Sequence, residues 1–167
     1  MYYNSSIMIN GRCIDINSPT YFVADVASNH NGDLAAAKEL IWLAKEAGAD
    51  AVKFQHFLAE KIVSDYGFQH LEVHASHQAN WKKSVYDTYK EAEFHRDWNE
   101  ELAIESQKAN ITYFTSPYDF EAVDGMEKYV PAYKIGSGDI TWIDFIEYLA
   151  KKNKPVMIAT GASEMWE

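Results

Sequence analysis

Short apolar runs alternate along the chain with longer segments in which apolar residues recur every three or four positions. The runs predict buried strands at 21–27 (YFVADVA), 51–56 (AVKFQH), 112–115, 132–135 and 155–160 (PVMIAT). The longer segments, 33–47, 94–109, 119–128 and 141–152, have the spacing of amphipathic helices. Apolar strands alternating with helices predict an α/β fold, in which a parallel sheet is covered by helices.

The helical spacing also predicts which side chains face the core. Asp33 is expected to cap the first helix and Gly48 to end it. The expected inward positions are Ala37, Leu40, Ile41, Ala44 and Ala47 in the first helix, Phe94, Trp98, Leu102 and Ala109 in the second, and Trp142, Ile146, Leu149 and Ala150 in the last.

Before the first buried strand, the segment 6–16 (SIMINGRCIDI) has two β-rich runs on either side of Asn10-Gly11. Asn-Gly is the preferred pair where both central residues of a tight turn need positive φ, so the segment predicts a β-hairpin. We expect residues 1–20 to form this hairpin unit and residues 21–167 to form the α/β domain.

The segment 57–90 has no clear period, and we expect it to be irregular. Four of the six histidines lie in or beside it, namely His56, His70, His74 and His77. An irregular stretch of this length is uncommon inside a compact domain and usually carries function. The spacing of the last three would suit one face of a helix, but without a helical pattern or accompanying cysteines we expect solvated loop histidines and no metal site.

Composition restricts the class of protein further. Apolar residues make up 47% of the 167 residues, which is enough for a packed core, and the formal net charge is −10. Such a balance argues against a nucleic-acid partner or an anionic membrane surface, because phosphates attract Lys and Arg. The single cysteine, Cys13, allows no disulfide within the chain, and no signal peptide or membrane-spanning run is found. We therefore expect a cytoplasmic protein.

Polar residues gather where the predicted strands end, which is where α/β proteins carry their working groups. The candidates are Asp25 near the end of the first strand with Asn29 and His30 after it, Lys53 and Gln55 on the second, Ser116 after the third, Lys134, Ser137 and Asp139 at the fourth, and Thr160 on the fifth.

Lys53 and Lys134 carry the most information among these candidates, because lysine is rarely found within an apolar strand unless its charge is paired. An anionic ligand would satisfy both ammonium groups. The alternative is that each lysine pairs with a carboxylate, such as Asp25 or Asp139. Two lysines on alternate strands, each followed by small polar residues, favour the ligand.

Two turns add further candidates. Gly136-Ser137-Gly138 would let backbone N–H groups approach a phosphate or carboxylate, with the serine hydroxyl as another donor, although glycines also make ordinary turns. Asn29 and His30 precede the first helix and are candidates for binding a polyhydroxylated substrate, while the residues after them are explained by the turn and the helix cap.

Four blocks together resemble the N-acetylneuraminate (sialic acid) synthase family, which includes the legionaminic and pseudaminic acid synthases. They are VADVASNHNGDLAAAKELIWLAKEAGADAVKFQ, YFTSPYDFEAV, VPAYKIGSGDI and KPVMIATGASE, in that order. The resemblance implies a (β/α)8 barrel of TIM type above an N-terminal hairpin, followed by an antifreeze-like domain. It implies condensation of phosphoenolpyruvate with an N-acylmannosamine-like amino sugar, which gives a nonulosonic acid and phosphate.

The resemblance also assigns roles to residues. Lys53 and Lys134 match the lysines that hold phosphoenolpyruvate, and Ser137 matches a hydroxyl of the same site. Ser116 matches the Thr or Ser that follows the third strand, and Asn80 matches an asparagine that reaches the sugar. Asp25 is the third catalytic candidate. These assignments agree with the candidates predicted from the positions of the residues in the strands. The family implies a divalent metal, Mn or Mg, and a homo-oligomer.

Three positions depart from the family pattern. Asp25 and Asp139 stand where Glu is usual, so each carboxylate is one methylene shorter. Ala159 stands where Ser is usual, which removes one donor on the phosphate side. These changes point to a different sugar or a weaker activity.

The predicted strands account for about five of the eight barrel strands. The metal-ligating histidines of the family lie on later strands, so we expect no metal ligands, no antifreeze-like domain and no activity from these residues alone, and exposed sheet edges that could pair with another copy. Three alternatives remain open: a synthase of other 3-deoxy keto sugar acids, an aldolase in which Lys53 or Lys134 forms a Schiff base, and a partial barrel that only binds ligand.

Overall fold

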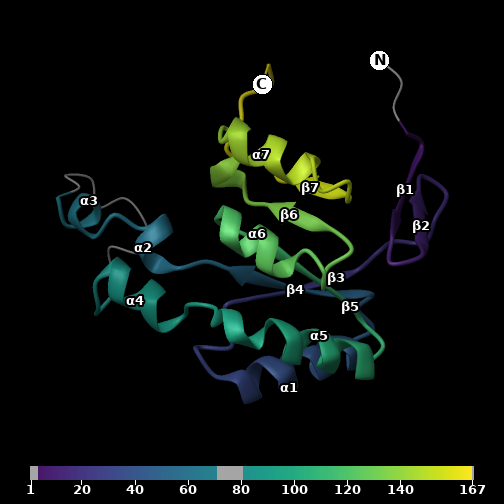
Figure 1. Cartoon of the computed structure of the whole chain (residues 1–167), viewed down its shortest axis with the longest axis horizontal. Coiled ribbons are helices and arrows are strands. Elements are labelled where there is room, and N and C mark those ends of the chain that lie inside the picture. The colour runs from purple at the N-terminus through teal and green to yellow at the C-terminus, as the bar shows by residue number, and fades with distance from the viewer. Residues whose placement is uncertain (1–3, 71–80, 167) are drawn as a thin grey trace.

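The structure, a computed structural model, describes residues 4–70 and 81–166 and contains two sheets (Figure 1). The larger sheet consists of β3 (Val23–Ala27), β4 (Ala51–His56), β5 (Thr112–Pro117), β6 (Tyr133–Ile135) and β7 (Val156–Ile158), which are neighbours in chain order and run parallel. The predicted α/β class and the five predicted strands are confirmed.

The smaller sheet is the predicted hairpin, in which β1 (Ser6–Ile9) pairs antiparallel with β2 (Arg12–Asp15). Asn10 and Gly11 have φ values of 48° and 79°, the positive values that favoured this pair in the sequence. Asn10 donates to Thr112 over 3.2 Å, and Arg12 forms an ion pair with Asp50, the residue before β4. These contacts hold the hairpin against the end of the sheet where β4 and β5 begin.

Four helices follow the strands in the order that the sequence predicted. They are α1 (Leu34–Glu46), α5 (Asn99–Lys108), α6 (Phe120–Met126) and α7 (Ile143–Ala150). Asp33 caps α1 by accepting from the backbone N–H groups of Ala35 and Ala36, and Gly48 follows the helix with a φ of 84°. The second helix starts later than expected, since a 3-10 turn, η2 (Arg96–Trp98), precedes α5.

The expectation that 57–90 is irregular was wrong for three parts of it. The described residues form the short helices α2 (Ala59–Ile62), α3 (Asp65–Gln69) and α4 (Val85–Glu91). Serine residues cap two of these helices, Ser64 for α3 and Ser84 for α4. Elements this short show no helical period in the sequence. Figure 1 shows these three helices and the hairpin at opposite ends of the sheet. Because the hairpin lies where β4 begins, the three helices lie where β4 ends.

The core lies between the sheet and the four longer helices. Phe54 and Tyr113 of the strands pack there with Ile41, Leu102 and Leu149 of the helices. Three expected inward positions are instead exposed, Ala47, Trp142 and Ala150, and Phe145 is buried in α7 in place of the last two. The period was right for α7, but its face is rotated relative to the one we expected.

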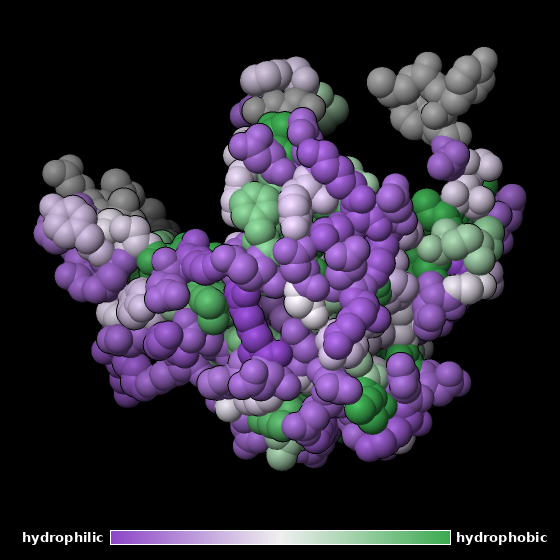
Figure 2. All heavy atoms as spheres, viewed as in Figure 1, coloured by the Kyte–Doolittle hydropathy of each residue, from purple (hydrophilic) through white to green (hydrophobic). Residues whose placement is uncertain are grey.

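The visible face of the molecule is mostly polar (Figure 2). Hydrophilic residues cover most of the face in Figure 2, and hydrophobic ones appear as separate patches. Within the described residues, no helix combines the length and the apolar character needed to cross a membrane.

Candidate functional site

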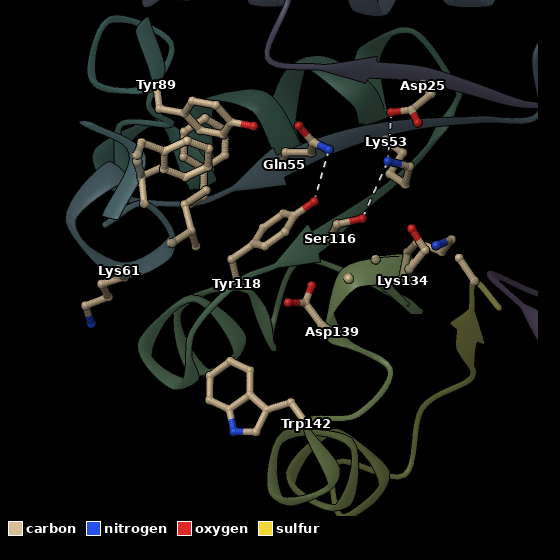
Figure 3. A pocket seen from close by; sticks show the side chains of 18 residues that line it. Asp25, Lys53, Gln55, Lys61, Tyr89, Ser116, Tyr118, Lys134, Asp139 and Trp142 are labelled. Carbon is tan, nitrogen blue, oxygen red and sulfur yellow. Dashed lines mark hydrogen bonds and ion pairs between the residues drawn. The ribbon is translucent and has the colours of Figure 1, made fainter. Parts of the chain in front are cut away.

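A pocket of about 640 Å³ lies on the side of the sheet opposite the buried face, toward the ends of the strands (Figure 3). Alternation along the strands explains its lining. Val52 and Phe54 of β4 are buried in the core, whereas Lys53 and Gln55, one residue further along in each case, line the pocket. Seven of the predicted site residues line it together: Asp25, Lys53, Gln55, Ser116, Lys134, Ser137 and Asp139.

Lys53 is the most deeply buried charge of the pocket, with a side chain that is 9% exposed. Its ammonium lies 2.7 Å from a carboxylate oxygen of Asp25, the residue opposite it on β3, and 3.5 Å from the hydroxyl of Ser116. The carboxylate pairing considered from the sequence is therefore present for Lys53. Asp25 is 59% exposed, so the pair opens onto the pocket.

Lys134 projects into the same pocket from β6, two strands away from Lys53 in the sheet. Its ammonium donates to the backbone carbonyl of Ile135, and no carboxylate of the described residues lies within ion-pair distance of it. Burial lowers the pKa of Lys134, and the nearby charge of Lys53 lowers it further, while Asp25 and Asp139 oppose the shift. The two ammonium groups thus repel one another, which an anion between them would relieve.

The turn after β6 completes this end of the pocket. Ser137 starts a 3-10 turn, η3 (Ser137–Asp139), and Ser137, Gly136 and Gly138 all line the pocket. A Cβ atom on Gly136 would lie 3.1 Å from the Asp139 carboxylate and 3.5 Å from the Tyr118 hydroxyl, so a side chain there would crowd both groups. Burial raises the pKa of Asp139, and the positive charge of Lys134 partly offsets that.

Gln55 and Tyr118 lie between the lysines and the far end of the pocket (Figure 3). The Gln55 amide donates to the Tyr118 hydroxyl over 3.1 Å. Burial raises the pKa of Tyr118 to about 12, with smaller contributions from Asp139, Tyr89 and Asp25. The phenol therefore keeps its proton at neutral pH and can donate it to a ligand.

Three predicted residues do not line the pocket. The ring of His30 is fully buried within 6.3 Å of the ring centres of Phe54, Phe94 and Trp98, and its Nδ1 accepts from the Gly32 backbone. We correct its placement, because a ring packed in the core cannot reach a ligand. Asn29 and Thr160 are exposed, and Asn29 donates to the Val26 carbonyl. Asn80, His74 and His77 lie outside the described residues.

Several lining residues were not predicted from the sequence. They are Phe57, Ile62, Val63, Phe68, Tyr89, Tyr118 and Trp142, together with Lys61. Most of them come from the segment 57–90, where the lack of a clear period hid the short helices. Tyr118 directly follows β5, so its place at a strand end could have marked it.

No group of three or more His, Cys, Asp and Glu side chains gathers as metal ligands among residues 4–70 and 81–166. The carboxylates of the pocket, Asp25 and Asp139, do not by themselves form such a set.

Comparison with known proteins identifies the family. The model of the NeuB family matches residues 40–167, more than half of the chain. The chain belongs to the NeuB family. The resemblance inferred from the four blocks is thereby confirmed.

Relatives in the NeuB family include named sugar-acid synthases. Human N-acetylneuraminate-9-phosphate synthase is 33% identical over 156 residues, which cover 93% of this chain and 43% of that protein. The N,N'-diacetyllegionaminic acid synthase of Campylobacter jejuni is 34% identical over 149 residues, which cover 89% of this chain and 44% of that protein. The chain thus spans less than half the length of these relatives.

A solved structure of a sialic acid synthetase is similar in fold. The citrate complex of the enzyme from Leptospira borgpetersenii serovar Hardjo-bovis has a TM-score of 0.79 and 28% sequence identity. The match covers 96% of this chain and 51% of that one. The arrangement of strands and helices described above is therefore also that of a sialic acid synthetase.

Proposed function

We propose that this chain forms the phosphoenolpyruvate-binding part of a NeuB-type active site, and that the whole enzyme condenses phosphoenolpyruvate with an N-acylmannosamine-like amino sugar. The observation that carries the proposal is that Lys53 and Lys134, from alternate strands, line one pocket together with Ser116 and Ser137. Phosphoenolpyruvate carries a carboxylate and a phosphate on a three-carbon frame, and two fixed ammonium groups with hydroxyl donors suit both anionic groups.

In the proposed reaction, the methylene carbon of phosphoenolpyruvate attacks the aldehyde carbon of the open-chain sugar, and the aldehyde oxygen takes up a proton. Water adds to the former enol carbon, and phosphate leaves by cleavage of its C–O bond, which gives a nonulosonic acid. We assign Lys53 and Lys134 to the anionic groups, where their positive charges also stabilise the charge that develops during the attack. Asp25, exposed beside Lys53, is assigned to the sugar side.

For the whole protein we propose a (β/α)8 barrel, of which residues 21–167 supply the first five strand–helix units and residues 1–20 the hairpin beneath it. We also propose a homo-oligomer and a divalent metal, Mn or Mg. The described residues do not form a ligand set for that metal, so no step is assigned to it here.

Calorimetric titration of the purified 167-residue protein with phosphoenolpyruvate tests the proposal. Lys134→Met should weaken binding by roughly 10- to 100-fold, the range expected for a lost hydrogen bond to a charged group. Lys151→Met, which removes an exposed lysine at the C-cap of α7, is the matched control and should leave the affinity unchanged. Equal affinities for the two variants would reject the proposed site.

The lowered pKa of Lys134 also suits a Schiff-base aldolase, because an amine nucleophile must lose its proton. Borohydride treatment in the presence of pyruvate separates the two functions. We expect no increase in protein mass, since a lysine that only binds the anion forms no imine. A mass increase that Lys134→Met abolishes would establish the aldolase instead. Tight binding of phosphoenolpyruvate without turnover by the whole protein at any metal concentration would leave the ligand-binding alternative.

A further inference from the structure

The two ends of the pocket differ in chemistry. Lys53, Lys134 and Asp25 gather on one side in Figure 3, whereas Tyr89 and Lys61 lie on the other, with Tyr118 between them. Four more apolar lining residues belong with Tyr89. Phe57 contacts its ring, Ile62 and Val63 follow Lys61 in the chain, and Phe68 comes from α3, which packs against α4. These five residues are here called the apolar wall. Pockets of 300–1,000 Å³ hold drug-sized ligands, so a pocket of about 640 Å³ has room for more than a three-carbon phosphate ester.

Contacts between its rings fix the shape of the apolar wall. The ring centre of Phe57 lies 5.5 Å from that of Tyr89 and 6.1 Å from that of Tyr118, which it meets edge to face. Phe57 is only 3% exposed, and the hydrogen bond from Gln55 holds Tyr118 in place. Aromatic side chains packed in this way present a preformed surface to a ligand, with little loss of side-chain freedom on binding.

Among the residues that the structure describes, Lys61 is the only cation beside the apolar wall. Carboxylates already compensate its positive charge. Its ammonium lies 2.6 Å from a Glu121 oxygen and 4.0 Å from an Asp119 oxygen. Anionic groups are therefore attracted to the lysine end, and an uncharged apolar group is suited to the far end.

We propose that the apolar wall binds the N-acyl group of the amino sugar, and that Tyr89 and Tyr118 determine selectivity for that group. The inference rests on the proposed function, because it takes phosphoenolpyruvate to occupy the lysine end. An acyl methyl is the most apolar group of such a sugar, whose other substituents are hydroxyls. Tyr118 lies between the two ends, where its phenolic proton can reach the amide oxygen of the same acyl group.

Saturation-transfer NMR on the 167-residue protein with phosphoenolpyruvate and N-acetylmannosamine tests this inference. Irradiation of the aromatic protons should give the acetyl methyl the largest saturation of any sugar proton. N-acetylmannosamine should also bind at least about tenfold more tightly than mannosamine, the usual range for an added apolar group in a fitted pocket. Tyr89→Leu and Tyr118→Ala should reduce the methyl saturation, and Tyr118→Phe, which keeps the ring, should retain it.

Tyr66→Ala is the matched control, since Tyr66 is 75% exposed and does not line the pocket. If phosphoenolpyruvate binds but the sugar ring protons receive as much saturation as the methyl, or the sugar receives none, the inference is wrong and the proposed function stands. If phosphoenolpyruvate itself does not bind, the proposed function fails and the inference fails with it.

Discussion

The carboxylate of Asp25 lies 2.7 Å from the ammonium of Lys53, and the two residues are directly opposite one another on β3 and β4. The ammonium is nearly buried and the carboxylate is largely exposed, so the pair is asymmetric. Asp25 satisfies Lys53 when the pocket holds no anion. A phosphoenolpyruvate molecule must therefore compete with this carboxylate, or lie beside it.

Asp25→Asn should tighten binding of phosphoenolpyruvate about two- to fivefold, because it removes a negative charge next to the anion but only a partly exposed ion pair. Calorimetry measures the change directly. Asp144→Asn, at an exposed position in the first turn of α7, changes the net charge equally and should have no effect. Weaker binding by Asp25→Asn would mean that the carboxylate positions Lys53 more than it competes with the ligand.

Ala159 lines the pocket beside the lysine end, at the position where the resemblance leads us to expect serine. Ala159→Ser should add a hydroxyl donor to the phosphate side and tighten binding by about 1.5 kcal/mol, roughly tenfold. Ala162→Ser, exposed three residues later, is the control and should leave the affinity unchanged. An unchanged affinity for Ala159→Ser would place the phosphate elsewhere in the pocket.

The strands and the lysine end of the pocket were predictable because alternation within a strand determines which side chains share a face. Lys53 and Gln55 follow from that rule, and so does the burial of Phe54 between them. For His30, which lies after the strand, the alternation rule gives no prediction. Its position after a strand suggested a ligand-binding role, but the chain turns there and packs the ring among aromatic residues of the core.

The apolar wall was not predicted, for a different physical reason. Its residues come mainly from α2, α3 and α4 or the turns beside them, and these helices are only four to seven residues long. An amphipathic period needs about two turns to be recognised. Helices of this length are not stable in isolation and depend on tertiary contacts within the protein. One such contact is the Glu93 carboxylate, which accepts from the Ala59 backbone N–H over 2.6 Å at the start of α2.

Stability should fall in mild acid because His56 is buried in its neutral form. Its Nε2 lies 3.0 Å from the Asn99 amide oxygen, and its Nδ1 contacts the Thr115 hydroxyl. Burial lowers the pKa of His56 from 6.5 to about 3, so unfolding takes up a proton at any pH between these values. The stabilisation is complete above pH 6.5 and is lost as the pH falls toward 3; between pH 7 and pH 5 the loss should be about 2 kcal/mol.

Urea unfolding at pH 7 and pH 5 measures this loss. His56→Gln should lower stability at pH 7, because it disturbs a buried hydrogen-bond network, but it should also shrink the difference between the two pH values. His70→Gln, at an exposed position, should keep the wild-type difference. If His56→Gln retained the full difference, the acid sensitivity would come from another group, such as His30, whose pKa burial also lowers.

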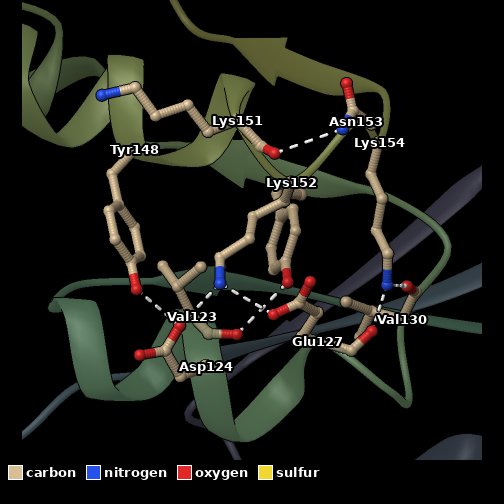
Figure 4. A network of polar contacts seen from close by, with 10 residues as sticks. Val123, Asp124, Glu127, Val130, Tyr148, Lys151, Lys152, Asn153 and Lys154 are labelled. Carbon is tan, nitrogen blue, oxygen red and sulfur yellow. Dashed lines mark hydrogen bonds and ion pairs between the residues drawn. The ribbon is translucent and has the colours of Figure 1, made fainter.

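Lys152 and Lys154 lie in the turn that follows α7 and contact the last turn of α6 and the residues after it (Figure 4). Lys152 bridges Asp124 and Glu127 at 2.7 Å each, and both carboxylates are about half exposed. Lys154 instead donates to the backbone carbonyls of Glu127 and Val130, just beyond the last residue of α6, and burial lowers its pKa. Glu127 is the C-cap of α6, and a carbonyl at a helix end has no partner within the helix, so Lys154 supplies one.

Lys154→Met should therefore destabilise the protein more than Lys152→Met, although Lys152 makes the two ion pairs. Loss of the donor to two carbonyls should cost about 1–3 kcal/mol, whereas partly exposed ion pairs contribute about 1 kcal/mol or less. Lys151→Met, at the neighbouring exposed position, should change the free energy of unfolding by no more than about 0.5 kcal/mol. Urea unfolding of the three variants gives the order directly, and a larger loss for Lys152→Met would show that the ion pairs, not the carbonyl contacts, hold α7 to α6.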